Sequence, residues 1–185
     1  MVRKTMWSSA ASIGLMALWL ALGPMTGLSY GHPPLPDDVR RAEPSLHLLG
    51  KGSQRLWGFR VYDASLWVVS GAWNPEEPHV LDVSVQRAIP AGQLIDAGIN
   101  EMERLGVGDA TKRKQWKSEL TGVVPDLRKD QRLIVFCNPN HTTYFYLDSG
   151  RIGEINDPSF GPAFFSIWLD PRTAKPQLRK SLLNK

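Results

Sequence analysis

Residues 48–69, LLGKGSQRLWGFRVYDASLWVV, place a glycine-rich turn and Arg55 directly before an apolar strand that carries a carboxylate, Asp63, at its centre. Over residues 59–69 the side chains alternate between two sides, and both sides are largely apolar. This pattern predicts a central strand that is covered on both faces. Because a buried ion without a partner is strongly unfavourable or loses its charge, Arg55 and Asp63 are the first candidates for a site.

Further strands and helices follow from hydrophobic periodicity and from turn residues along the rest of the chain. The predicted strands after the first are residues 80–87, 132–137, 142–147 and 151–155, and the predicted helices are residues 90–105, 109–120, 157–169 and 176–183. Gly106 ends the first helix and Asp109 caps the second. Strands followed by helices, then strands and helices again, indicate an α+β fold, and no internal repeat is seen.

The N-terminus has the pattern of a secretory signal peptide, which we predict over residues 1–31. Arg3 and Lys4 precede an apolar stretch at residues 10–22, which is shorter than the roughly 20 residues that cross a bilayer. A permanent anchor is the alternative. We expect a periplasmic or secreted protein with no stable membrane span after cleavage, an exposed lead-in at residues 32–44, and a single domain at residues 45–185.

The charge of the chain gives no support for nucleic-acid binding. Removing the first 31 residues takes away two of the 22 basic residues and none of the 18 acidic ones, which leaves a net charge of +2. Nucleic-acid binding normally shows as a concentrated basic face or stripe. The basic cluster at residues 112–117 lies on a predicted helix and is best interpreted as a solvated face, so we expect no nucleic-acid partner.

Metal and nucleophile motifs are missing from the sequence. Its four histidines are far apart and Cys137 is its one cysteine, so neither a metal site nor an internal disulfide is predicted. No Gly-x-Ser-x-Gly elbow occurs, and the glycines at 50 and 52 are not followed by the residues of a phosphate-binding loop. We therefore expect no metal and no cofactor.

The remaining polar candidates are Arg55, Arg60, Asp63 and Arg87, which lie close to two predicted strands. Arg87 ends the apolar side of the strand at residues 80–87. If that strand neighbours the one with Asp63, an arginine–aspartate pair could lie beneath the helices. Such a pair would be either a structural tie or the polar end of a pocket.

Several segments of the chain resemble one known family. They are GKGSQR, VYDASLW, WKSELTGVVPDLRKDQRL, TTYFYLDSGRIGEI, FGPAFFSIWLDPRT and QLRKSLL. In order and spacing this set is similar to the chalcone isomerase-like proteins, specifically their bacterial exported branch, over residues 46–183. The resemblance implies an open-faced β-sandwich, in which a large antiparallel sheet carries helices on one face and a ligand cleft lies between them.

The resemblance also suggests roles for individual residues. Arg55 matches the strand arginine that stabilises developing charge in the plant enzymes, and Ser166 matches a late hydroxyl. Asp63 falls near the position of a threonine, and residues 90–100 contain no tyrosine. A carboxylate there would repel a phenoxide, so electrostatic stabilisation of chalcone isomerisation would be weak.

Other proteins of this fold bind fatty acids through the strand arginine and a nearby tyrosine, which here would be Arg55 and Tyr62. Our leading hypothesis is therefore non-catalytic binding of a small amphipathic carboxylate, such as a fatty acid. The predicted ligand-binding residues are Arg55, Tyr62, Asp63, Arg87 and Ser166. The alternatives are an intramolecular lyase or isomerase, and an envelope protein with a structural or partner-binding role.

Overall fold

The computed structural model describes residues 33–185, so the predicted signal peptide lies outside the described residues. The elements in chain order are α1 (Asp37–Ala42), β1 (His47–Leu56), β2 (Phe59–Val68), β3 (His79–Val85), α2 (Ala91–Leu105), α3 (Ala110–Val123), β4 (Arg132–Cys137), β5 (Thr143–Leu147), β6 (Gly150–Ile155), α4 (Phe160–Leu169) and α5 (Pro176–Leu182). In this part of the chain, no helix has both the length and the apolar character needed to span a membrane.

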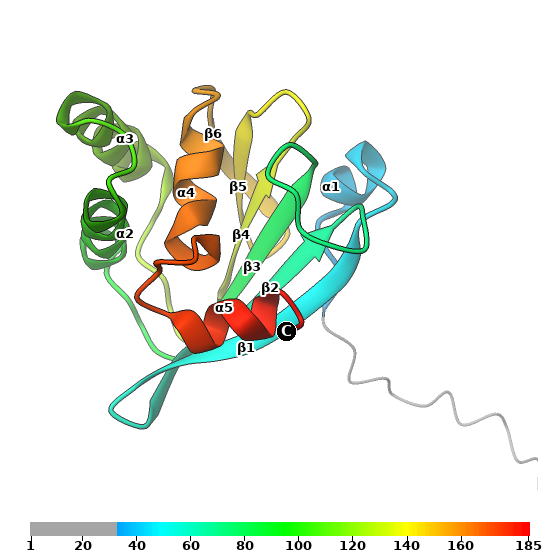
Figure 1. The fold of residues 1–185 in the computed structure, drawn as a ribbon, viewed down its shortest axis with the longest axis horizontal. Coiled ribbons are helices and arrows are strands. Elements are labelled where there is room, and N and C mark those ends of the chain that lie inside the picture. Colours follow the sequence, from blue (N-terminus) through cyan, green and yellow to red (C-terminus); the bar gives the residue numbers. More distant parts are fainter. Residues whose placement is uncertain (1–32) are drawn as a thin grey trace, which may run out of the picture. The chain divides into compact units, whose positions relative to one another are not determined.

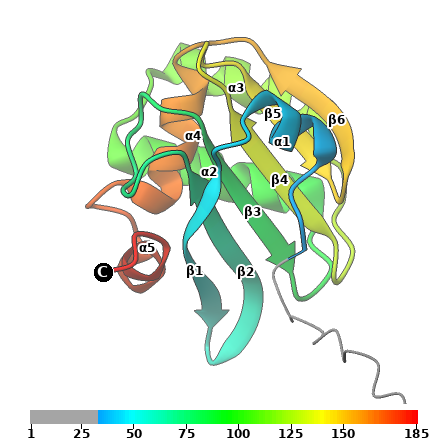
Figure 2. The same ribbon diagram turned by 90° about the vertical axis from the view of Figure 1, so that its right-hand side faces the viewer.

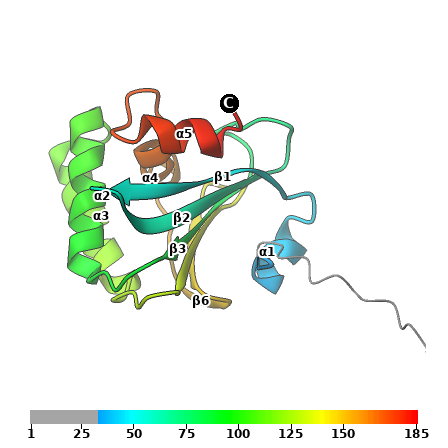
Figure 3. The ribbon, with the colours of Figure 1, turned by 90° about the horizontal axis from the view of Figure 1, so that it is seen from below.

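The six strands form one antiparallel sheet in the order in which they occur along the chain. Helices α2, α3, α4 and α5 lie on one face of this sheet (Figures 1 and 3). The main core lies between them and contains the inward side chains of the central strands, such as Leu81, Val135 and Phe145. The predicted α+β fold, a large antiparallel sheet with helices on one face, is confirmed.

Strand β1 corrects the prediction of a glycine-rich turn. Gly50 and Gly52 lie inside the strand and pair with Leu66 and Ala64 of β2. A Cβ atom at Gly50 would lie 2.3 Å from the backbone oxygen of Ser181, in α5. The glycines therefore do not form a turn. They allow α5, which lies more than a hundred residues further along the chain, to pack closely against β1.

The opposite face of the sheet corrects the prediction of an exposed lead-in. Leu35 and Val39 are buried there against Val80, Ile134 and Phe136, and α1 covers this patch (Figure 3). The alternation of β3 and β4 leaves apolar side chains on both faces of the sheet. Part of residues 32–44 is therefore needed to cover the second face.

A buried ion pair also ties this N-terminal segment to the sheet. The guanidinium of Arg132 binds the carboxylate of Asp82, whose side chain is fully buried. Arg132 also donates to the carbonyl oxygen of Pro34 at 3.4 Å. Since a buried carboxylate without its cation would be strongly unfavourable, this pair fixes the position of the chain before α1.

Hydrogen bonds from side chains position the helices above the sheet. The carboxylate of Asp109 caps α3 by accepting from the backbone N–H of Lys112 at 2.8 Å. Asp157, which lies before α4, accepts from Trp116 Nε1 at 2.9 Å and from Lys112 Nζ at 2.7 Å. Burial opposes the charge of Asp157, but the hydrogen bonds from Lys112, Ser159 and Trp116 outweigh it and hold its pKa below the usual value. Together these bonds join α3 to the start of α4.

Cys137 ends β4 and is buried under α4. A Cβ atom at Gly161 of α4 would lie 2.8 Å from the Cys137 sulfur, so the helix approaches the sheet as closely as a glycine allows. Burial raises the pKa of the thiol to about 11. The thiol is therefore protonated and shielded, and it packs as a small apolar group.

Candidate ligand cavity

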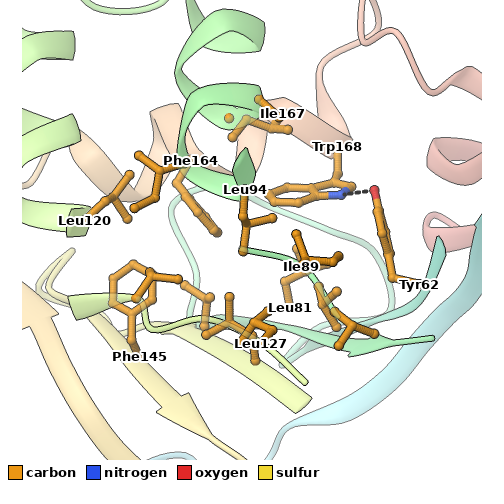
Figure 4. A pocket seen from close by; sticks show the side chains of 18 of the residues that line it. Tyr62, Leu81, Ile89, Leu94, Leu120, Leu127, Phe145, Phe164, Ile167 and Trp168 are labelled. Atoms are coloured by element: carbon orange, nitrogen blue, oxygen red, sulfur yellow. Dashed lines mark hydrogen bonds between the residues drawn. The ribbon is translucent and has the colours of Figure 1, made fainter. Parts of the chain in front are cut away.

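A cavity of about 120 Å³ lies between the sheet and helices α2 and α4 (Figure 4). Its walls are apolar side chains from the inward face of the sheet, from the apolar stripe of α2, and from α4. The lining residues are Tyr62, Leu81, Val83, Val85, Ile89, Leu94, Ile95, Ala97, Gly98, Met102, Leu120, Val124, Leu127, Leu133, Val135, Phe145, Phe164, Ile167, Trp168 and Lys175. An apolar ligand or an aliphatic tail is therefore the natural occupant.

Tyr62 of β2 is one of two polar residues that line the cavity, and the other is Lys175. The hydroxyl oxygen of Tyr62 accepts a hydrogen bond from Trp168 Nε1 of α4 at 3.0 Å (Figure 4). Burial raises the pKa of the Tyr62 phenol to about 12, although the bond from Trp168 opposes this. The phenol is therefore neutral near pH 7 and still has its own proton to donate to a ligand oxygen.

Lys175 is the cation that lines the cavity, in the segment between α4 and α5. It is only partly exposed. Burial lowers the pKa of its ammonium group, while the charge of Glu101 acts in the opposite direction. A carboxylate placed in the cavity would therefore find one ammonium group and one phenol among the lining residues.

Glu101 of α2 holds the segment that carries Lys175. Its carboxylate accepts from Arg104 at 2.7 and 2.9 Å and from the backbone N–H of Ala174 at 2.9 Å. The hydrogen bond from Arg104 is the largest cause that lowers the pKa of Glu101, to about 2. Thr173 Oγ1 also donates to the carbonyl oxygen of Ile167 at 2.7 Å, which joins the segment to α4.

Of the five predicted ligand-binding residues, Tyr62 lines the cavity and the other four do not. Arg55 is exposed near the end of β1 and donates to the carbonyl oxygen of Gly58 at 3.2 Å. Because strand side chains alternate, Asp63 points to the face opposite Tyr62. Arg55 therefore does not form the predicted clamp with Tyr62.

Asp63 is a structural group in this geometry. Its carboxylate accepts from Ser53 Oγ at 2.5 Å and from Gln86 Nε2 at 2.8 Å, and it lies 3.2 Å from Arg60 Nε. The predicted arginine–aspartate pair thus involves Arg60 rather than Arg87. Asp63 of β2 thus links β1, through Ser53, to Gln86, which directly follows β3.

Arg87 and Ser166 also lie away from the cavity. Arg87 is exposed beyond the end of β3. The hydroxyl of Ser166 donates to the carbonyl oxygen of Ala163 at 2.6 Å, within α4. Arg55 and Ser166, which the resemblance matched to catalytic groups, therefore do not face a common space.

Lys175 was missed by the sequence analysis because nothing in the pattern marks it. It follows a helix-breaking Asp170–Pro171 pair and precedes Pro176, so the sequence predicts only a connection between two helices at this point. Only the fold shows that this connection passes over the cavity. Within residues 33–185 no cluster of His, Cys, Asp and Glu side chains is suited to holding a metal ion.

The sequence of this chain matches one known protein family. A family model described as chalcone isomerase-like matches residues 30–184. The chain belongs to the chalcone isomerase-like family. Among proteins with curated descriptions, none is similar to it in sequence.

A solved structure with a similar fold is that of a fatty-acid binding protein from Arabidopsis thaliana. The TM-score is 0.59 at 11% sequence identity, and the match covers 76% of this chalcone isomerase-like chain and 87% of the plant chain. At this identity the similarity shows a shared fold alone. The residues of the cavity therefore have to carry any inference about the ligand.

Proposed function

We propose that this chalcone isomerase-like protein binds a small amphipathic carboxylate, without catalysis. The head group would lie between the Lys175 ammonium and the Tyr62 hydroxyl, and the apolar tail would fill the cavity. The observation that carries the proposal is a cation in the lining of a cavity whose other walls are almost entirely apolar. Lys175 thus takes the role that the sequence analysis gave to Arg55.

The size of the cavity limits the ligand. Its volume of about 120 Å³ is comparable to that of an engineered apolar cavity of roughly 150 Å³ that binds benzene. A short aliphatic acid or a single aromatic ring with a carboxylate matches this space. A long fatty acid would require α4 or α2 to move away from the sheet.

Two further points support the proposal. The fatty-acid binding protein from Arabidopsis thaliana has a similar fold, which makes the same kind of ligand a reasonable choice for this chain. We also propose that the protein is exported to the periplasm or the medium, since residues 1–31 have the sequence of a signal peptide. In that location it would meet acids from outside the cell.

The test is calorimetric titration with hexanoate and with 1-hexanol, which have tails of the same length and differ in the head group. A charge-assisted pair with Lys175 should make hexanoate bind at least about tenfold more tightly than the alcohol. Lys175→Met should abolish that preference, while Lys180→Met, at an exposed position of α5, should keep it. Val135→Phe, which fills part of the cavity, should weaken both ligands.

Octanoate and dodecanoate extend the titration to longer tails, and their affinities should stop rising where the cavity is full. Two results would refute the proposal. One is a wild-type protein that binds neither hexanoate nor its longer homologues. The other is an undiminished preference for the carboxylate in Lys175→Met, which would assign the head group to a different cation.

A further inference from the structure

The hairpin between β1 and β2 has an exposed apolar tip. Leu56 pairs with Phe59, and Trp57 and Gly58 form the two-residue turn between them. Both turn residues have positive φ, 48° at Trp57 and 82° at Gly58, as in a type I′ turn. Figures 1 and 2 show that this hairpin extends past the neighbouring strands.

The side chains at the tip bury little surface in the described structure. Trp57 is 90% exposed, Phe59 is 76% exposed and Leu56 is 47% exposed. A left-handed backbone disfavours a bulky residue and favours Gly, Asn or Asp. Trp57 therefore stabilises neither the turn nor the core. A residue that is unfavourable for its backbone conformation and makes no buried contacts in return indicates a function.

Three arginines lie near the base of the apolar tip. Arg55 lies opposite Arg60 in the β1–β2 register, and both are exposed. The backbone N–H of Gln86 bonds to the carbonyl of Val61, so the exposed Arg87 follows beside the same pair of strands. Arg60 is partly neutralised by Asp63 at 3.2 Å, which leaves Arg55 and Arg87 as the main cations at the base of the tip.

We propose that this hairpin tip docks into the surface of an anionic lipid bilayer. Tryptophan and phenylalanine favour the boundary between lipid head groups and acyl chains, and arginines nearby attract anionic head groups. The tip thus has the combination of aromatic and basic groups that an anionic bilayer surface binds. This inference stands on the hairpin and does not depend on the ligand of the cavity.

Docking at this place would also orient the cavity. Tyr62 lies three residues after Phe59 on β2 and pairs with Val85, and both residues line the cavity. The end of the sheet that would face the bilayer is therefore the end at which the cavity has its phenol.

Co-sedimentation with vesicles tests the proposal. We expect binding to vesicles of equal parts phosphatidylcholine and phosphatidylglycerol, and much weaker binding to phosphatidylcholine alone. The double variant Trp57→Asn with Phe59→Ser should lower the partition coefficient at least about tenfold. Leu48→Ser, an exposed apolar position of β1 away from the tip, should leave it unchanged.

The charge contribution is tested separately. Arg55→Gln should weaken binding to the anionic vesicles about fivefold and reduce its salt dependence. Arg41→Gln, at an exposed position of α1, should have no effect. The melting temperature of Trp57→Asn should equal or exceed that of the wild type, because Asn tolerates the positive φ. The melting temperature of the double variant is measured as well, so that lost binding is not mistaken for unfolding.

Three results would overturn the proposal. The first is a wild-type protein that does not bind anionic vesicles, and the second is equal binding by the wild type and the double variant. The third is self-association of the wild type without lipid, measured by sedimentation velocity and abolished by Trp57→Asn. That result would make a second copy of the chain, rather than a bilayer, the partner of the tip.

Discussion

At the scale of single residues, His79 is a titratable group enclosed by the core. Its ring lies edge-on to Phe165, with 4.2 Å between the ring centroids. Its Nδ1 lies 2.6 Å from the carbonyl oxygen of Glu77, while Nε2 is buried without a hydrogen-bond partner in the described part of the chain. Burial lowers the pKa of His79 to about 4.

This burial predicts a pH dependence of stability. In the unfolded chain His79 takes up a proton below its ordinary pKa of 6.5, whereas the folded state resists protonation down to about pH 4. The contribution of His79 to the free energy of unfolding is thus fully present above pH 6.5 and is lost as the pH falls toward 4. It amounts to roughly 3 kcal/mol in the free energy of unfolding.

Urea denaturation at about pH 7 and about pH 4.5 measures this loss. The wild type should lose more stability between the two pH values than His79→Gln, which cannot titrate at this position. His47 and His141 remain in both proteins, so the difference between them isolates His79. Equal losses would mean that the His79 ring is not enclosed in solution.

At the scale of secondary-structure elements, the contact between β1 and α5 predicts a strong effect of a single methyl group. Gly50→Ala would bring a Cβ atom to 2.3 Å from the Ser181 oxygen and 2.5 Å from the Leu182 oxygen. Backbone atoms cannot move aside easily, so α5 must shift. We expect a loss of about 1–3 kcal/mol in the free energy of unfolding.

Gly122→Ala provides the matched comparison by chemical denaturation. Gly122 lies in α3, and nothing lies within 4 Å of its added Cβ atom. Alanine should therefore raise the free energy of unfolding by up to about 1 kcal/mol. If Gly50→Ala were also neutral or stabilising, α5 would not rest on β1 as described.

The sequence predicts most elements because their periodicity is local. The alternating strands β2 to β6 and the apolar stripe of α2 follow from neighbouring residues. Strand β1 was missed because Gly50 and Gly52 resemble turn residues. Glycine is needed at these positions because α5 packs against them, and α5 is too distant in the sequence for the residues around position 50 to indicate it. Helix α1 was missed because a Pro-rich, charged segment conceals the two apolar residues that it buries.

At the scale of the whole molecule, the packed unit begins at Pro34. A chain that starts at residue 32, as expected after export, is therefore the reference for a shorter truncation. A chain that starts at residue 45 removes Leu35 and Val39 and uncovers Val80 and Ile134. It also removes the carbonyl of Pro34 that accepts from Arg132.

For the shorter chain we expect a loss of about 3 kcal/mol or more, because two buried aliphatic side chains contribute roughly 1.5–3 kcal/mol each. Thermal unfolding of the two truncated chains measures the difference. Equal melting temperatures would show that residues 34–44 are dispensable and would restore the boundary predicted at residue 45.

The candidate site shows the limits of sequence reasoning at this scale. The resemblance identifies Tyr62, as the tyrosine that accompanies the strand arginine in fatty-acid binders of this fold. Asp63 was grouped with it although the alternation of β2 turns it to the other face. Arg55 is a candidate because it precedes the apolar strand and because the resemblance matches it to a functional arginine. Lys175 becomes a candidate only in the folded structure, where it lines the cavity. Cavities are formed by contacts between distant segments, and local patterns do not encode them.

Cys137 gives the molecule an internal reporter. Its sulfur touches Gly161 under α4, so a thiol reagent can reach it only after that helix lifts from the sheet. The same movement would make room for tails longer than the resting cavity holds. The alkylation rate of Cys137 thus reports how often α4 moves away from the sheet. A ligand that displaces α4 should raise this rate, whereas a ligand that fits beneath the helix in its resting position should lower it.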